Sequence, residues 1–362
     1  MRKEIKVLQI ITKAEWAGAQ RVVYEICKIS KEYQNLKIEV ATGENGILVD
    51  KLEKDLGIKV HVLKNLIHPI NAFIDYKGYK EIERLIRENH YDVVHCHSTK
   101  AGILGRLAAN KVGVKRIIYT VHGYWPILQY HGIRRKMAIF LERYLAKRTT
   151  DLVLISRSDV ELSKRMKIGD EEKYRLIYNR ITVEKDKIEN GLLRKELNID
   201  NNIRIIGNVA RVDNPKNPFL FIDIANEYLK ENNDVLFVWV GDGSLIQQAK
   251  DYVEKLNLKE KVKFIGFRQN GIECMKDFDL LLLTSNWEGV PITILEAIEL
   301  KIPILSTDVG GIKEIIGKNS VFGMPYSISE ICKMIDKKLN SREIIEYNCD
   351  NFSDYIKLYS ID

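Results

Sequence analysis

The chain has 362 residues, 45% of them hydrophobic and 30% charged, with a formal net charge of +7, which predicts a soluble globular protein of two domains. No apolar run approaches the ~18 residues of a membrane-spanning helix, and a strand-like run at residues 5–11 leads us to expect no signal peptide. The five cysteines are scattered without a C-x-x-C pair, which indicates a reducing cytosol and argues against a disulfide framework or structural zinc.

In the first half of the chain, short apolar runs alternate with segments of helical length. Strands are expected at 4–11, 37–41, 58–62, 92–96, 116–121, 151–155 and 174–178. Helices are expected at 19–33, 48–56, 74–89, 100–112, 133–148 and 157–167. This alternation predicts parallel strands with helices on both faces. Residues 1–182 are therefore predicted to form a Rossmann-like N-terminal domain.

Residues 183–201 lose the apolar periodicity and become charged, so they are predicted to form a linker or linker helix, after which the alternation restarts. Strands are expected at 203–209, 235–240, 262–265, 279–283, 303–306 and 320–322. Helices are expected near 217–232, 245–256, 291–299, 312–317 and 327–339. Residues 202–341 would form a second Rossmann-like domain. A last helical stretch, roughly 342–359 within the C-terminal segment 342–362, would pack back on the N-terminal domain. The predicted fold class is α/β, with two doubly wound parallel-sheet domains facing each other across a ligand cleft.

The charge is unevenly distributed along the chain. Residues 1–180 hold 34 basic and 21 acidic side chains, a net +13, whereas residues 181–362 hold 23 and 29, a net −6. The basic half is expected to meet an anionic partner, either nucleic acid or a membrane surface. Its densest cluster, residues 134–148, mixes cations with aromatic and aliphatic residues at helical spacing. This pattern fits an interfacial membrane helix, and equally a helix that packs its apolar stripe on its own domain.

The most informative motif is the stretch from Ser285 to Ala297, in which seven residues separate Glu288 from Glu296. A buried parallel strand is expected just upstream, and Pro291 suits the first position of a helix. Glu288 would then lie on the turn and Glu296 about one and a half turns into the helix. The amides and dipole of the helix N-terminus suit phosphate, and the two carboxylates could bind hydroxyls on either side. The alternative is a surface helix with two solvated glutamates.

Two strand-end turns of the first half carry candidate ligand-binding residues. The Ala17–Gly18 turn opens a helix but lacks the G-x-G-x-x-G fingerprint, which disfavours a nicotinamide or flavin dehydrogenase. His122 follows a strand and precedes a glycine, where ligands of open α/β sheets bind. His95 and His97 flank Cys96 at another strand end without a third spaced ligand, so a metal site there is not expected.

Three further turns in the second half follow predicted strands. Arg211 and Lys216 are two cations on one turn, a pair suited to a diphosphate leaving group, although exposed loop cations are common in a basic protein. The turns at 241–244 and 308–311 contain glycines that permit close backbone approach. Together these turns indicate one ligand site rather than coincidence.

In this order, these residues resemble a retaining glycosyltransferase of family 4 with the GT-B fold. The matching segments are 17–23, 120–123, 211–216, 241–243, 288–297 and 303–311. The resemblance implies transfer of a sugar from a nucleotide diphosphate donor, which in this family is commonly a UDP-sugar. The anomeric configuration would be retained, and neither a metal nor a cofactor would be needed. It also implies a glycan or polyprenyl-linked acceptor, polysaccharide or glycolipid biosynthesis, and a cytoplasmic place at the inner face of the cell membrane. Nucleic acid is then not expected as a partner.

The resemblance also implies roles for individual residues. Arg211 and Lys216 would neutralise the diphosphate, Glu296 would hold the ribose, and Glu288 the transferred sugar. His122 would contact sugar hydroxyls near the reacting carbon. The acceptor side would be lined by Gly18 and Ala17, and the rest of the donor site by Gly289, Val290, Ile292, Thr293, Gly241, Gly266 and Phe267.

The chain departs from the family pattern at four positions. Family members commonly have glycine where this chain has Ala17, Ala210, Asn217 and Arg180. Two other functions remain as alternatives. A nucleotide-sugar epimerase of the same fold would need acid and base groups around the sugar, and a non-catalytic nucleotide-sugar-binding protein would not need the intact charged set.

Overall fold

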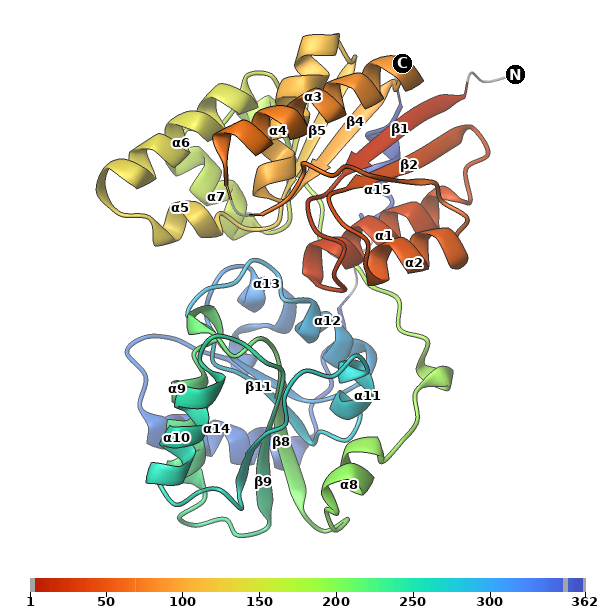
Figure 1. Cartoon of the computed structure of the whole chain (residues 1–362). Coiled ribbons are helices and arrows are strands. Elements are labelled where there is room, and N and C mark those ends of the chain that lie inside the picture. Colours follow the sequence, from red (N-terminus) through yellow and green to blue (C-terminus); the bar gives the residue numbers. More distant parts are fainter. Residues whose placement is uncertain (1–3, 69, 348–350, 361–362) are drawn as a thin grey trace. The chain divides into compact units, whose positions relative to one another are not determined.

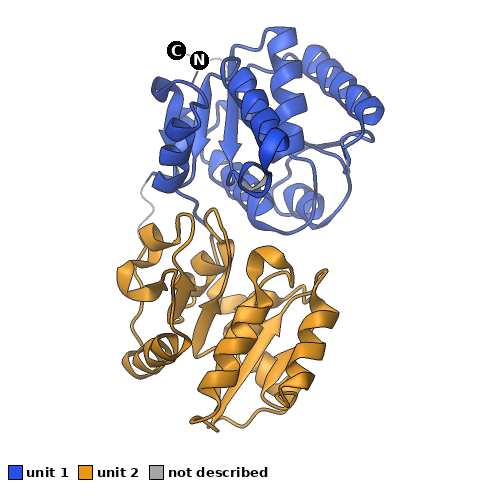
Figure 2. Cartoon of the chain, turned by 90° about the vertical axis from the view of Figure 1, so that its left-hand side faces the viewer, with its two compact units in different colours: residues 1–181, 349–362 blue, residues 182–348 orange. Residues whose placement is uncertain are grey.

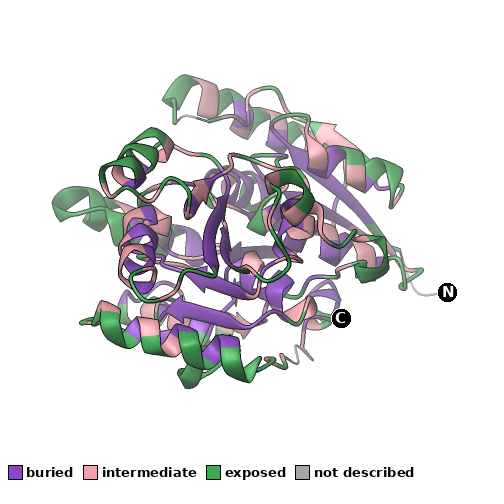
Figure 3. Cartoon of the chain, turned by 90° about the horizontal axis from the view of Figure 1, so that it is seen from below, coloured by how far each residue is buried: buried purple, intermediate pink, exposed green. Residues whose placement is uncertain are grey.

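A computed structural model describes residues 4–68, 70–347 and 351–360. The chain divides into two compact units (Figures 1 and 2). The first contains residues 1–181 and 349–362, and the second contains residues 182–348. Each unit has one all-parallel sheet, so the predicted α/β class with two parallel-sheet domains is confirmed. In Figure 3 the strands are mainly buried, while the helices carry the exposed residues.

The sheet of the first unit has seven strands in the order β3-β2-β1-β4-β5-β6-β7. The strands are β1 (Ile5–Ile10), β2 (Leu36–Thr42), β3 (Val60–Val62), β4 (Val93–His97), β5 (Arg116–Val121), β6 (Asp151–Leu154) and β7 (Tyr174–Leu176). The helices are α1 (Gly18–Ser30), α2 (Ile47–Lys54), α3 (Ala72–Asn89), α4 (Thr99–Val112), α5 (Trp125–Gln129), α6 (Gly132–Ala146), α7 (Arg157–Arg165) and α15 (Asp354–Lys357). Helix α4 packs beside α3 and α6, whereas α1 packs against α2 and α15 (Figure 1). Of these helices, α5 was not predicted.

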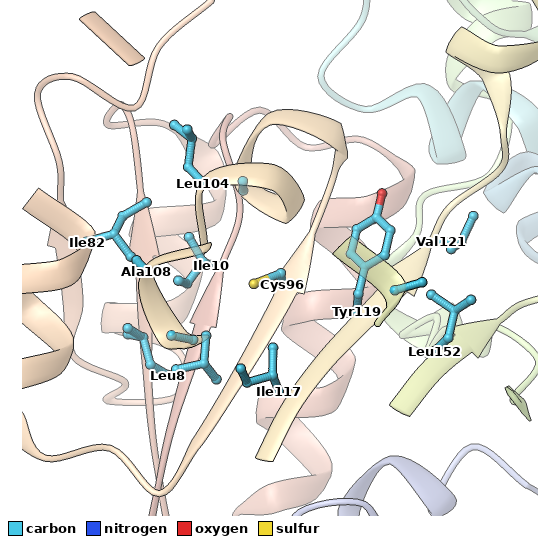
Figure 4. Packing of buried hydrophobic residues seen from close by; sticks show 14 of the residues in the cluster. Leu8, Ile10, Ile82, Cys96, Leu104, Ala108, Ile117, Tyr119, Val121 and Leu152 are labelled. Carbon is cyan, nitrogen blue, oxygen red and sulfur yellow. The ribbon is translucent and has the colours of Figure 1, made fainter. Parts of the chain in front are cut away.

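The core of the first unit depends on the close approach of α4 to the sheet. A Cβ at Gly105 would lie 2.6 Å from the Cys96 sulfur, and one at Gly102 would lie 2.4 Å from the Tyr119 ring, so both positions suit glycine. Figure 4 shows the packing of buried hydrophobic residues in this core. The residues labelled there are Leu8, Ile10, Ile82, Cys96, Leu104, Ala108, Ile117, Tyr119, Val121 and Leu152.

One buried ion pair joins α4 to α6. The Arg106 side chain is fully buried and donates through Nη2 to both carboxylate oxygens of Glu142, at 3.2 and 2.9 Å. Its Nε donates to the Gly102 carbonyl oxygen at 2.7 Å, and its guanidinium carbon lies 3.9 Å from the centre of the Tyr119 ring. The only acidic residue of α6 is therefore turned inward.

The sheet of the second unit has six strands in the order β10-β9-β8-β11-β12-β13. The strands are β8 (Arg204–Val209), β9 (Val235–Val240), β10 (Val262–Phe264), β11 (Leu280–Leu283), β12 (Ile304–Thr307) and β13 (Val321–Phe322). The helices are α8 (Leu192–Leu197), α9 (Pro218–Tyr228), α10 (Ile246–Lys255), α11 (Gly271–Met275), α12 (Ile292–Glu299), α13 (Ile312–Ile316) and α14 (Ile328–Ser341). Strand β8 lies between β9 and β11, and the strand order reverses there. In the first unit the order reverses at β1, which lies between β2 and β4. Such switch points are where open α/β sheets bind ligands.

The segment predicted as a linker, 183–201, packs on the second unit. The Asp277 carboxylate accepts hydrogen bonds from the backbone N–H groups of Gly191, Leu193 and Arg194 at 2.8, 2.8 and 3.1 Å. Leu193 is fully buried. The segment shows little apolar periodicity because it buries the side chain of Leu193 rather than a stripe of several apolar residues.

The predicted helix at 342–359 is wrong in extent. Helix α14 ends at Ser341 because Arg342 adopts a left-handed backbone conformation, with φ of 46°. Residues 342–347 are not helical, residues 348–350 lie outside the described part, and α15 has four residues. The described C-terminal segment belongs to the first unit. There Asn351 Nδ2 donates to the Leu176 carbonyl oxygen at 2.8 Å, and Tyr359 is fully buried.

Candidate functional site

The β8–α9 loop of the second unit carries the two predicted phosphate-binding cations. Arg211 is 74% exposed and its guanidinium lies 2.8 Å from the Asp213 carboxylate. Burial raises the pKa of Asp213, and the charges of Arg211 and Lys216 oppose this shift. Asn217 closes the loop with φ of 48°. Asparagine tolerates this left-handed conformation, so Asn217 can occupy a position at which members of the resembled family commonly have glycine.

Lys216 joins this loop to the β11–α12 loop. Its Nζ lies 2.5 Å from Glu288 Oε1, which also accepts a hydrogen bond from Ser285 Oγ at 2.6 Å. The Lys216 and Glu288 side chains are only 20% and 10% exposed. The Thr284 hydroxyl donates to the carbonyl oxygens of Lys216 and Asn217 at 3.1 and 3.0 Å. The two loops meet because β8 and β11 are neighbours in the sheet.

Helix α12 carries the second glutamate. It begins at Ile292, with Pro291 as its N-cap residue, one position later than predicted. Thr293 Oγ1 donates to the Val209 carbonyl oxygen at 3.1 Å, which fixes the first turn of α12 to the end of β8. The Glu296 side chain is buried, so the alternative of a surface helix with two solvated glutamates is wrong. Val290 is also buried.

The β9–α10 turn and the residues after β10 lie beside the same loop. The Gly241 N–H donates to the Gly266 carbonyl oxygen at 2.9 Å. A Cβ at Gly241 would lie 1.9 Å from the Ala210 carbonyl oxygen, and φ there is +149°, so this position requires glycine. Phe267, next to Gly266, is 65% exposed.

The β12–α13 loop supports the backbone around Glu288. Gly310 has φ of +59°, and a Cβ there would lie 2.1 Å from the Glu288 carbonyl oxygen. The Gly311 N–H donates to the Gly289 carbonyl oxygen at 3.0 Å, and Thr307 Oγ1 donates to the Ser285 carbonyl oxygen at 2.7 Å. The paired glycines, noted in the sequence for their close backbone approach, thus approach a neighbouring loop. The sequence alone could not identify the Glu288 backbone as the neighbour of these glycines, because it lies about twenty residues away in the chain.

Replacing Gly310 with alanine is expected to weaken binding of UDP, the nucleotide that the resemblance implies, by about tenfold, because the new Cβ displaces the Glu288 backbone. The circular dichroism spectrum should not change. Gly57→Ala is the matched control, since Gly57 has a similar φ of +61° and open space around it. Calorimetric titration with UDP measures both variants. Equal UDP affinity in the two would show that the Gly310 contact does not position the Glu288 loop.

The first unit brings His122 into a cluster with both histidines of β4. His97 Nδ1 lies 3.1 Å from His122 Nε2, and the His95 and His97 rings are 4.1 Å apart between centroids. His95 also lies 2.9 Å from the Tyr359 hydroxyl and 2.7 Å from Thr120 Oγ1. The sequence showed the His-Cys-His pattern, but the pairing with His122 depends on the adjacency of β4 and β5.

Burial governs the charge of this cluster. It lowers the pKa of His122 to about 4 and that of His95 to about 3, with repulsion from His122 adding to the shift of His95. Burial also lowers the pKa of His97 well below its usual value, assisted by both neighbouring rings. His122 is therefore neutral near pH 7 and can donate or accept a hydrogen bond without carrying charge. Among the described residues, no group of three or more histidine, cysteine, aspartate or glutamate side chains could hold a metal ion.

Ala17 and Gly18 lie at the start of α1, just past the end of β1. Ala17 is the N-cap residue, with an extended backbone and no capping side chain, and Gly18 begins the helix. The first turn of α1 contains no acidic residue. Both residues follow the central strand at which the order of the sheet reverses.

Each half of this chain matches a known protein family. Residues 16–185 match the family described as Glycosyltransferase Family 4, and residues 190–357 match Glycosyl transferases group 1. The chain is 31% identical to UDP-Gal:alpha-D-GlcNAc-diphosphoundecaprenol alpha-1,3-galactosyltransferase of Escherichia coli, over 96% of this chain and 92% of that protein. It is 29% identical to the O-antigen biosynthesis glycosyltransferase WbnH of Escherichia coli, over 86% and 84%.

Solved structures show the same fold. The crystal structure of Anabaena HepE in complex with UDP and glucose matches with a TM-score of 0.79 and 20% identity, over 98% of both chains. WaaG, a glycosyltransferase involved in lipopolysaccharide biosynthesis, matches with a TM-score of 0.69 and 18% identity, over 99% of this chain and 97% of that one.

Proposed function

The chain belongs to glycosyltransferase family 4 and has the GT-B fold, and on this basis we propose that it transfers a sugar from a UDP-sugar to a lipid-linked glycan with retention of configuration. The observation that carries the proposal is the half-buried Lys216–Glu288 pair at the switch point of the second sheet, with Arg211 on the same loop. The names of two relatives point the same way, since one uses UDP-Gal and another was crystallised with UDP and glucose. The product would enter a polysaccharide or glycolipid.

The second unit supplies the donor site. Lys216 and Arg211 bring two positive charges to the loop, and the N-terminus of α12 adds its dipole, which together would stabilise the charge of a departing diphosphate. Lys216 has three N–H donors, so it can bind Glu288 and a phosphate oxygen at once. Glu296 would bind the ribose hydroxyls and Glu288 a sugar hydroxyl. Because protein cations supply the charge, the proposed reaction uses neither a metal ion nor another cofactor.

The contacts of Glu288 argue against its use as a nucleophile. Its Oε1 accepts from both Lys216 and Ser285, and hydrogen bonds to a carboxylate lower its nucleophilicity. We therefore favour attack on the face from which the diphosphate leaves. The acceptor oxygen forms a bond to the anomeric carbon as the bond from that carbon to the phosphate oxygen breaks. The acceptor proton passes to the departing phosphate, and UDP and the glycoside are the products.

The acceptor would bind the first unit, beside Ala17, Gly18 and the neutral His122. A diphosphate-lipid acceptor is supported by the Escherichia coli relative, whose name specifies a diphosphoundecaprenol substrate. The net charge of +13 on residues 1–180 suits an anionic membrane surface. We place the enzyme in the cytoplasm, peripheral at the inner face of the cell membrane, with no role for nucleic acid. Among the described helices, none is long and apolar enough to cross a bilayer.

Incubation with labelled UDP-sugars and a synthetic GlcNAc-diphospholipid tests the proposal. We expect label in the lipid product, an α linkage from an α-configured donor by NMR, and unchanged rates with EDTA. An isomerised donor without transfer would indicate an epimerase, and UDP binding without turnover would indicate a binding protein. An inverted linkage would overturn the retaining mechanism, and loss of activity with EDTA would overturn the metal-free one.

A further inference from the structure

Helix α6 turns a row of large apolar side chains towards solvent. Ile133, Met137, Phe140 and Tyr144 are 75%, 65%, 71% and 41% exposed, and their spacing of four, three and four residues places them on one face. We call these four residues the α6 stripe. Six of the fourteen large apolar side chains exposed by the described residues lie between Leu128 and Tyr144. A cluster of this kind indicates a binding surface rather than scattered surface apolar residues.

The α6 stripe is not needed for packing within the first unit. The opposite face of the helix makes that contact, through Leu145 and Ala146, which are buried, and through the Glu142–Arg106 pair. Helix α6 therefore has one apolar face directed into its own unit and a second one directed outward. The sequence pattern left these two possibilities open, and the structure shows both on one helix.

Positive charge surrounds the α6 stripe. Residues 132–148 contain six cations and a single acid, and that acid is buried. Among the described residues, none of the six forms an ion pair, although Arg143 and Arg148 donate hydrogen bonds to the backbone carbonyl oxygens of Met166 and Tyr144. The six are Arg134, Arg135, Lys136, Arg143, Lys147 and Arg148.

We propose that the α6 stripe inserts into the headgroup layer of a membrane that contains anionic phospholipid, with the surrounding cations on lipid phosphates. Apolar side chains bordered by Lys and Arg are what an in-plane membrane helix presents. A symmetric dimer through the stripe would bring the same unpaired cations together, which disfavours a second copy as the occupant. A nucleic acid backbone would leave the apolar side chains without a partner. This inference rests on the proposed function, because the proposed lipid-linked acceptor would lie in the same membrane surface.

The test is sedimentation of the full chain with vesicles rich in phosphatidylglycerol, compared with vesicles of neutral phosphatidylcholine. We expect binding to the anionic vesicles that weakens with salt. The M137E/F140E variant is expected to bind at least about tenfold more weakly, since it places two carboxylates in the stripe. Ile344→Glu is the matched control, because Ile344 is an apolar residue of the second unit that is 50% exposed. It should bind vesicles like the parent protein.

Equal vesicle binding by M137E/F140E and the parent, or no binding by the parent, would overturn the proposal. A parent dimer that the variant converts to a monomer would show that the stripe is a contact between copies. UDP titration separates this proposal from the proposed function. If UDP does not bind but the anionic vesicles do, the membrane surface stands and the proposed reaction fails.

Discussion

The Lys216→Ala variant is expected to lose about 100- to 1,000-fold in kcat for sugar transfer, because charge that develops on the departing diphosphate would lose the more buried of the two proposed cations. Glu288→Ala is expected to cause a similar loss, since it removes the acceptor of both the Lys216 and Ser285 hydrogen bonds. The two side chains act as a pair, so the double variant should lose less than the product of the two single losses. Steady-state kinetics with the donor measures all three.

Lys263→Ala provides the control for this experiment. Lys263 pairs with Glu260 at 2.9 Å in the same unit, but on strand β10, and no part of the proposed donor site contains it. Its kcat should stay within about twofold of the parent, as for an exposed ion pair. Full transfer activity in Glu288→Ala would contradict the assigned role of that carboxylate. Equal losses in Lys216→Ala and Lys263→Ala would point to a general charge effect.

Glu142→Ala is expected to destabilise the first unit by about 3–5 kcal/mol, because it leaves the fully buried Arg106 guanidinium without its counter-charge. Hydrogen-exchange mass spectrometry should show faster exchange in α4, α6 and β5. Exchange in the second unit should not change, because the pair joins elements of the first unit alone. The same variant should loosen the attachment of α6, the helix that carries the α6 stripe.

Two further variants test this explanation. Glu88→Ala removes the partner of Arg84, an ion pair of 2.6 Å whose side chains are 78% and 55% exposed, and should cost less than about 1 kcal/mol. The double variant R106M/E142L replaces the buried pair with apolar side chains and should recover most of the loss. If Glu88→Ala and Glu142→Ala had the same effect, burial of the charge would not be the cause.

The strands could be predicted closely because each is a short apolar run bounded by polar residues, as buried parallel strands are. The predicted 116–121 and 235–240 agree with β5 and β9 at both ends. The failures have a different origin. Nothing local in the sequence reveals that residues 342–347, expected to begin a last helix, are not helical, since Arg342 adopts a left-handed backbone conformation although arginine is a good helix former. Nor does it reveal that Asp277 holds the segment around Leu193 in place from more than eighty residues away.

The candidate site could likewise be predicted from local sequence only in part. Each polar residue at a strand end could be selected from the sequence, because ligands bind at that edge of a parallel sheet. The partners could not be selected, because they depend on which strands are neighbours. Lys216 meets Glu288 because β8 lies beside β11, and His122 meets His97 because β5 lies beside β4. Pairing across 72 residues has no counterpart in local spacing.

The return of the C-terminal segment means that the second unit is an insertion within the chain of the first. Two peptide connections therefore link the units, one at 181–182 and one at 348–349. A protease that cuts only the connection at 181–182 should therefore leave two fragments that stay associated, because Tyr359 and Asn351 of the second fragment hold its last segment against β4 and β7 of the first. A chain that stops at Ser341 would instead lose the Tyr359 hydroxyl, which contacts His95, and with it a contact that supports the histidine cluster of the first unit.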